Sequence, residues 1–387
     1  MIQLADRIGR LGTETAFEVL AKARALEAQG KKIIHLEIGE PDFTTPKNIC
    51  DAAVRSLQNG DTHYTPAPGV MEIRKAIADY VSKTRGVEYT AENVVMTPGA
   101  KPIMFFTMLA LIQKGDEVIY PNPGFPIYES MINFVGGKAV PLRLRQKNEF
   151  NVDLKEFKKL VSKKTKLVII NSPGNPTGKT IPQDDVEAIA DILYKKKCYI
   201  LSDEIYSRIT YDGAKPFSIA KIDGFKDRTI ILDGFSKTYA MTGWRAGYGV
   251  MNTELTPVIS KLMVNSNSCT NAFVQKACIE ALNGPQDEVG KMVAEFDRRR
   301  KIIVDGLNSI NGFRCTTPDG AFYSFPNIKD TGYKSKELAD KLLYEAGVAC
   351  LAGTSFGKYG EGFLRISYAN SVENIQEAIN RIKSVID

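Results

Sequence analysis

One lysine stands among small and hydroxyl residues in the segment GFSKTYAMTGWRAGY, which covers residues 234–248. The only other charged residue of this segment is Arg245, eight positions after Lys237. A lysine amine attacks a carbonyl carbon only when it is deprotonated, and desolvation or neighbouring cations lower its pKa. The segment therefore predicts either an ordinary loop between buried strands or a reactive lysine beside an arginine that binds an anion.

Other chemically useful segments follow short apolar runs in the same way. TPGAK follows NVVM, NSPGNPTG follows LVII, DEIY follows YILS, and DGFSKT, which contains Lys237, follows TIIL. Ligands of open parallel sheets bind beyond the carboxyl ends of the strands. These four segments are therefore expected to meet at one site.

Each segment brings a different chemical group. Residues 99–101 start a helix, where free backbone N–H groups and the helix dipole favour an anion such as phosphate. Asn175 begins a tight turn that leaves its amide available to a ligand oxygen. Asp203, with Tyr206 close by, is a carboxylate that is costly to bury unless a cation or donor meets it, so it is a candidate partner for a protonated ring nitrogen. Taken singly, each of these also has an ordinary explanation as a turn, a loop cap or a solvated side chain.

The segment PGNPTGKT is similar to a phosphate-binding P-loop because it ends in Gly-Lys-Thr. The P-loop pattern requires a glycine at the position of Pro173, and Gly174 lies one residue too close to the lysine. The spacing therefore excludes a P-loop and favours a tight turn.

The elements that must position these groups form an α/β pattern. Between about residues 94 and 250, short β-branched runs alternate with amphipathic stretches of helical length, which predicts a mostly parallel sheet with helices on both faces. The runs are NVVM, EVIY, LVII, YILS, TIIL and GYGV. After residue 250 the pattern changes to long helices and then to a mixed region typical of a smaller α+β domain. We predict a large domain over residues 46–285 and a small domain formed by residues 1–45 and 286–387.

Shorter signals outline the rest of the chain. Residues 15–29 have helical spacing, and Gly30 is placed to end that helix. The run IIHLEI predicts a strand, and Thr45 and Pro46 predict the N-cap and first position of a helix that stops at Gly60. In the small domain, AFYSF, VACL and FLRIS predict strands, and residues 336–346 and 371–386 predict helices.

Composition excludes several classes of protein. The net charge is +6, from 51 basic and 45 acidic residues, and the basic residues are dispersed or lie in short runs, so nucleic-acid binding is not implied. The six cysteines are scattered without a C-x-x-C pair, as in cytoplasmic proteins, and the two histidines are too few for a His-rich metal site. No apolar run is long enough to cross a bilayer, and the N-terminus has no apolar signal region. We expect a cytoplasmic protein with no metal and no membrane partner.

Considered together, the groups at the strand ends match what one cofactor requires. An anion site, a ring-oxygen donor, an aspartate, a tyrosine, a lysine that forms a Schiff base and an arginine for phosphate occur in order, and pyridoxal phosphate needs these partners. The sequence resembles the class I aminotransferases of fold type I, the aspartate aminotransferase group. The resemblance covers nearly the whole chain, in GEPDF, YTPAPG, PGNPTG, SDEIY, GFSKTYAMTGWRAGY, GAFY and LRISYA.

The resemblance implies a role for individual residues. Lys237 resembles the lysine that binds the cofactor covalently and moves the substrate proton, with Asp203 at the ring nitrogen and Tyr206 and Asn175 at the ring oxygen. The expected catalytic residues are Lys237, Asp203 and Tyr206, and the expected cofactor-binding residues are Gly99, Ala100, Lys101, Phe125, Asn175, Asp203, Tyr206, Ser236, Lys237, Arg245 and Tyr64. Arg365 resembles the arginine that binds the substrate α-carboxylate with its planar fork, assisted by Gly39 and Asn175. Tyr64 resembles a tyrosine that reaches the neighbouring subunit, which implies a homodimer with shared active sites.

Two positions bear on the substrate. Relatives that prefer aspartate generally stack a tryptophan on the ring, and Phe125 lacks the indole donor. Some relatives bind an acidic side chain with a lysine at the position of Lys101 and an N-terminal threonine, whereas the corresponding segment here is GTETAFEV. Acidic and broader amino-acid substrates both stay open.

Three functions are compatible with the sequence to different degrees. The first is a ping-pong aminotransferase that moves an amino group from an L-amino acid to a 2-oxo acid. The second is a pyridoxal phosphate-dependent lyase or cyclase on the same scaffold. The third is a cofactor-sensing transcription regulator, which is disfavoured because no helix-turn-helix or basic patch is visible and family-like sequence begins almost at residue 1.

Overall fold

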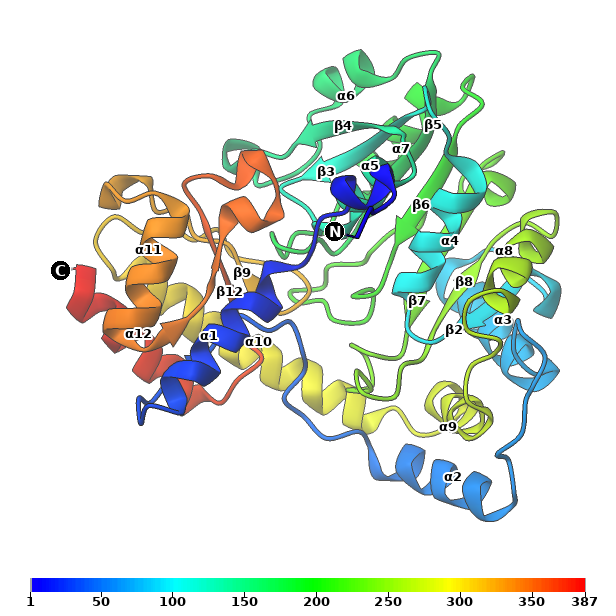
Figure 1. Ribbon diagram of the computed structural model, residues 1–387, viewed down its shortest axis with the longest axis horizontal. Helices are drawn as coiled ribbons and strands as arrows, with labels where there is room; N and C mark the ends of the chain where they lie inside the picture. The colour runs from blue at the N-terminus through cyan, green and yellow to red at the C-terminus, as the bar shows by residue number, and fades with distance from the viewer. Residues whose placement is uncertain (1, 387) are drawn as a thin grey trace.

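The computed structural model describes residues 2–386 and contains two groups of elements (Figure 1). The larger group is built on a seven-stranded sheet in the order β2-β8-β7-β6-β5-β3-β4, in which only β8 runs antiparallel to its neighbours. The strands are β2 (Val94–Thr97), β3 (Glu117–Asn122), β4 (Lys138–Arg143), β5 (Thr165–Asn171), β6 (Tyr199–Asp203), β7 (Thr229–Gly234) and β8 (Gly247–Val250). The predicted α/β class with a mostly parallel sheet is confirmed.

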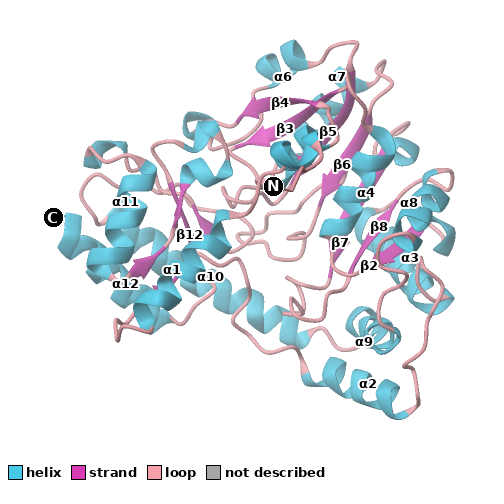
Figure 2. Cartoon of the chain, viewed as in Figure 1, coloured by secondary structure: helices cyan, strands magenta, loops and turns pink. Residues whose placement is uncertain are grey.

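Helices cover both faces of this sheet, as Figure 2 shows. The helices of the larger group are α2 (Lys47–Gln58), α3 (Met71–Arg85), α4 (Lys101–Leu111), α5 (Ile127–Phe134), α6 (Leu154–Leu160), α7 (Gln183–Leu193), α8 (Leu255–Val264) and α9 (Ala272–Asn283), and α2 packs against α9. Strand β5 shows how the sequence produces this arrangement. Leu167 and Ile169 pack in one core cluster with α4, α5 and α8, whereas Val168 and Ile170 pack in another with α6 and α7. A continuous apolar run is needed because successive side chains point to opposite faces and both faces are buried.

The smaller group joins the N-terminal segment to the C-terminal part of the chain. Its elements are α1 (Thr15–Glu27), β1 (Ile34–His35), α10 (Asp287–Asn308), β9 (Tyr323–Ser324), α11 (Ser335–Lys341), a π-helical turn (Leu342–Ala346), β10 (Val348–Ala349), β11 (Leu351–Ala352), β12 (Leu364–Ser367) and α12 (Val372–Ile386). Strand β1 pairs with β10, and Ile34 and Leu36 enter the same core cluster as residues of α10 and α12. The predicted additional α+β domain is therefore present, and the boundaries at residues 46 and 285 stay a prediction.

Several local predictions were wrong. Thr45 does not cap α2: its hydroxyl donates to the carbonyl oxygen of Ala240 and accepts from the indole of Trp244, and the helix begins at Lys47 after Pro46. The strand expected over IIHLEI is only the two residues of β1. Strand β4 was missed because KAVPLR contains Pro141 and two charged residues, which an edge strand tolerates.

Among residues 2–386, no helix is long and apolar enough to cross a membrane. The same described residues contain no group of three or more His, Cys, Asp or Glu side chains arranged to hold a metal ion.

Candidate active site

The site is a cavity of about 590 Å³ at the carboxyl ends of β5, β6 and β7, where the N-terminal segment and β12 also meet. Most of the predicted site residues line it, namely Gly39, Ala100, Lys101, Phe125, Asn175, Asp203, Tyr206, Ser236, Lys237, Arg245 and Arg365. Gly99 lies just outside, beside Ala100. Tyr64 lies away from the cavity with 90 % of its surface exposed. A single chain therefore brings together the whole predicted set except Tyr64.

Lys237 projects from the turn that follows β7. Its Nζ donates a hydrogen bond to the carbonyl oxygen of Gly39 at 2.5 Å and lies 5.8 Å from the ring centre of Phe322. Burial lowers the pKa of Lys237 to about 8, because the desolvated ammonium is disfavoured. A larger fraction of this amine is therefore deprotonated at neutral pH than for an ordinary lysine.

Asp203 ends β6 and is buried at the base of the cavity. The hydroxyl of Tyr128, from the first turn of α5, donates to its carboxylate at 2.5 Å, and the backbone N–H of Ile205 donates at 3.3 Å. Burial raises the pKa of Asp203 to about 6, against these two hydrogen bonds. A cation at this carboxylate would stabilise its charged form.

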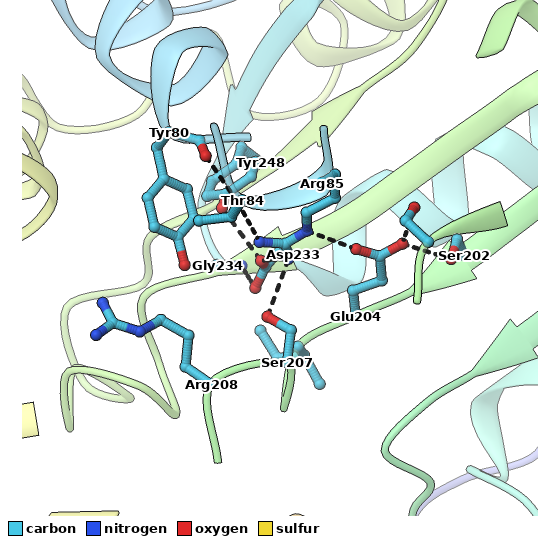
Figure 3. A network of polar contacts seen from close by, with 12 residues as sticks. Tyr80, Thr84, Arg85, Ser202, Glu204, Ser207, Arg208, Asp233, Gly234 and Tyr248 are labelled. Carbon is cyan, nitrogen blue, oxygen red and sulfur yellow. Dashed lines mark hydrogen bonds and ion pairs between the residues drawn. The ribbon is translucent and has the colours of Figure 1, made fainter. Parts of the chain in front are cut away.

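A buried polar network is centred on Arg85, the last residue of α3, and includes Glu204, which directly follows Asp203 in the chain (Figure 3). The Arg85 guanidinium contacts Glu204 at 2.8 Å and Asp233 at 2.6 Å, and it also donates to the hydroxyls of Thr84 and Ser207. Although burial alone lowers the pKa of Arg85, the two carboxylates raise it well above its ordinary value. The network thus holds one charged cation, hydrogen-bonded to two carboxylates and two hydroxyls, next to the ends of β6 and β7.

The far end of the cavity can bind an anion. Arg245 has φ of +54°, a strained value for a residue with a side chain, and its guanidinium lies against Gly99. A Cβ at position 99 would lie 2.3 Å from Nη2 of Arg245, so only glycine permits this approach. Ala100 precedes α4, whose first backbone N–H groups have no partner within the helix. An arginine and a helix N-terminus therefore meet at this end.

Polar side chains from two loops and from β9 line the central wall. The hydroxyls of Tyr206 and Tyr323 lie 2.7 Å apart, and a Cβ at Gly39 would lie 2.2 Å from the Tyr323 hydroxyl. Burial raises the pKa of Tyr206 well above its ordinary value, so its hydroxyl keeps its proton and can donate. Oδ1 of the Asn175 side chain is buried and has no partner among the described residues. These groups are arranged to bind an oxygen-bearing ligand.

Arg365, from β12, brings a second buried cation to the cavity. It is only 3 % exposed, its Nη2 donates to the carbonyl oxygen of Glu37, and its Nε has no hydrogen-bond partner in the described part of the chain. Within residues 2–386 it forms no ion pair with a carboxylate. Burial lowers its pKa, which reflects the cost of an unpaired charge. An anionic group of a ligand would remove that cost.

Several lining residues were not identified from the sequence. Among the polar ones are Glu14, Tyr128, Asn171 and Tyr323. Asn171 directly follows an apolar run, and Tyr323 belongs to the GAFY motif, so both had a detectable signal. Tyr128 lies three positions after Phe125 and could have been found from that spacing on a helix. Nothing in the sequence pairs Glu14 with Lys101, whose Nζ it contacts in the structure.

The fold and this cavity define an enzyme of the aminotransferase class, and the comparisons agree. The sequence profile of the family "Aminotransferase class I and II" matches residues 31–382, so the chain belongs to this family. The predicted family and its activity, amino-group transfer, are confirmed, and the family implies pyridoxal phosphate as cofactor. Nothing in the comparisons favours the lyase or cyclase alternative.

Particular relatives extend over the whole chain. An aspartate aminotransferase of Pyrococcus horikoshii is 40% identical over 386 residues, covering 99% of this chain and 97% of the relative. A (5-formylfuran-3-yl)methyl phosphate transaminase of Methanocaldococcus jannaschii is also 40% identical, covering 99% and 100%. Among solved structures, an aspartate aminotransferase from Thermus thermophilus with maleate superimposes with a TM-score of 0.95 at 33% identity, covering 100% of both chains.

Proposed function

We propose that the chain transfers the amino group of an L-amino acid to a 2-oxo acid in this cavity, with pyridoxal phosphate as cofactor and with the two substrates bound in turn. The observation that carries the proposal is the common cavity of a lysine of lowered pKa, a buried carboxylate and a buried unpaired guanidinium, namely Lys237, Asp203 and Arg365.

The residues present fit the cofactor. The phosphate would be held by Gly99, Ala100, Ser236 and Arg245. Gly99 leaves room for the guanidinium of Arg245, backbone N–H groups are free from Ala100 onward, and Ser236 supplies a hydroxyl. Asp203 would meet the protonated ring nitrogen. Tyr206 and Asn175 would bind the ring oxygen, Phe125 would stack on the ring and Lys237 would bind it covalently. When bound, pyridoxal phosphate withdraws electrons from the substrate Cα and carries the amino group between the substrates.

The protein side chains would position the substrate and move its proton. Arg365 binds the α-carboxylate in a bidentate manner, with Gly39 and Asn175 beside it. Nζ of Lys237, deprotonated at neutral pH more readily than an ordinary lysine, removes the proton from Cα as general base. The donor is aspartate, glutamate or one of a broader set of amino acids, since Lys101 offers a cation while Phe17, Leu351 and Phe356 offer apolar surface.

We also propose a cytoplasmic homodimer with shared active sites and the two-domain division at residues 46 and 285. Tyr64 supports the dimer, because a large aromatic residue 90 % exposed on a monomer is accounted for if it contacts a second copy. The six unpaired cysteines support the location.

Replacing the proposed base tests the function. Lys237→Ala should abolish amino transfer with every donor, whereas Lys47→Ala, which alters a lysine 86 % exposed in its side chain, should retain it. Turnover is measured with a panel of donors against 2-oxoglutarate, pyruvate and oxaloacetate. Full activity of Lys237→Ala would refute the proposed role.

The lyase or cyclase alternative is tested by supplying a donor without a 2-oxo acid. An aminotransferase should consume about one equivalent of donor per site and then stop. Continuous turnover without an acceptor would contradict the proposal and favour elimination or cyclisation.

A further inference from the structure

An internal ion pair occupies one wall of the cavity. Nζ of Lys101, at the start of α4, contacts Oε1 of Glu14 in the N-terminal segment, and both residues line the cavity. The Glu14 side chain is 19 % exposed and that of Lys101 is 48 % exposed. The carboxylate of the protein therefore already neutralises this cation before any substrate enters.

The N-terminal segment is held where it can present Glu14 to the cavity. The backbone N–H of Gly12 donates to the Ser130 hydroxyl at 2.9 Å, and this hydroxyl donates back to the Gly12 carbonyl oxygen at 3.2 Å. Nε of Arg10 donates to the carbonyl oxygen of Asn133 at 2.8 Å. Both contacts are with α5, and the chain then crosses to α1 on the smaller group of elements (Figure 1). Glu14 lies at this crossing.

The other cations of the cavity have tasks in the proposed function. Arg365 receives the α-carboxylate, Arg245 the phosphate, and Lys237 acts as base. Lys101 was expected among the cofactor-binding residues, but its Nζ contacts Glu14. It is therefore the cation left for a second carboxylate on the substrate, and its three N–H donors suit a carboxylate. A dicarboxylic substrate must compete with Glu14 for it.

On the basis of the proposed function, we propose that Glu14 is a specificity-determining residue that occupies Lys101 in place of the second carboxylate of the substrate. Dicarboxylic amino and 2-oxo acids bind only by displacing Glu14, which lowers their affinity relative to monocarboxylic substrates. The apolar surface of Phe17, Leu351 and Phe356 is unaffected by this competition and receives uncharged side chains.

The test is equilibrium binding of unreactive acids to the holoenzyme by calorimetry. Succinate represents the dicarboxylic class and 3-phenylpropanoate the monocarboxylic class. Glu14→Gln should raise the affinity for succinate relative to 3-phenylpropanoate by roughly 1.5-fold to fivefold, the range expected when a partly exposed ion pair no longer competes. The matched control is Glu18→Gln, an exposed carboxylate four residues later that does not line the cavity and should leave the ratio unchanged.

A second comparison shows whether the effect acts through Lys101. In a Lys101→Gln background, adding Glu14→Gln should no longer raise the ratio. An unchanged or lowered ratio in the single Glu14→Gln variant would overturn the proposal, and so would a gain that persists without Lys101. Amino transfer is measured on the same variants: if no donor is turned over even by the unaltered enzyme, the proposed function fails, whereas normal turnover with an unaltered binding ratio refutes only the role of Glu14.

Discussion

Two buried arginines serve opposite purposes in this molecule. Arg85 contacts the carboxylates of Glu204 and Asp233 and also donates to two hydroxyls. Arg365 has aromatic neighbours, with the Tyr323 ring centre 4.6 Å from its Cζ, and leaves Nε without a partner in the described structure. A buried cation with its counter-ions stabilises the fold it belongs to, whereas one without them is a site for an anion. The difference separates the structural support of the cavity from its binding groups.

The largest change in stability is expected when the paired cation, Arg85, is replaced. Arg85→Met should reduce the free energy of unfolding by about 3–5 kcal/mol, because it leaves Glu204 and Asp233 as uncompensated buried charges. Denaturant unfolding of the holoenzyme measures this change. The control is Glu204→Gln in the same background, which should recover part of the loss. An Arg85→Met protein as stable as the unaltered enzyme would mean that the network contributes little.

Replacing the unpaired cation, Arg365, should lower activity and leave stability intact. Arg365→Met should lower kcat/KM by a factor that corresponds to about 2–5 kcal/mol of lost binding energy, since the substrate α-carboxylate loses its charged partner. The free energy of unfolding should stay unchanged or rise, because an unpaired buried charge has been removed. Steady-state kinetics and denaturant unfolding are compared on the same preparation. A large loss of stability with intact kinetics would reverse the assignment of the two arginines.

The buried carboxyl group of Asp203 predicts a pH dependence of stability. Burial raises the pKa of Asp203 to about 6, above its unfolded value, so protonated Asp203 stabilises the folded state below about pH 4 and this contribution is lost as the pH rises through about 6. As the pH rises from about 4 to about 6, the free energy of unfolding of the cofactor-free unaltered chain should therefore fall by about 2–3 kcal/mol relative to that of Asp203→Asn. Unfolding at a series of pH values measures the difference. A flat difference would show that Asp203 is not destabilised by burial.

The smallest effect is expected at the surface. Lys47 and Asp51 form an i,i+4 ion pair at 2.7 Å in α2, with the Lys47 side chain 86 % exposed. Lys47→Gln should change the free energy of unfolding by only about 0.3–0.5 kcal/mol, with the change decreasing as salt is added. An effect as large as that of Arg85→Met would contradict burial as the cause of the difference.

Much of the fold could be predicted from local patterns. Strands β5, β6 and β7 were found because their runs are buried on both faces and are continuously apolar. Strand β4 was missed because an edge strand needs neither feature. Thr45 was assigned to a cap from its position before Pro46, but the distant Ala240 carbonyl and Trp244 indole compete for its hydroxyl.

The sequence alone determined the order of the reactive groups and the edge of the sheet at which they meet. Asn175, Asp203 and Lys237 each follow an apolar strand, and parallel strands have their carboxyl ends at one edge, so local signals suffice to bring them together. Only the tertiary structure decided which charges face one another. Glu14 and Lys101 are 87 positions apart, and Arg85 lies 119 and 148 positions from its two carboxylates. Such pairs depend on how helices and loops pack across the sheet, and no local periodicity encodes that packing.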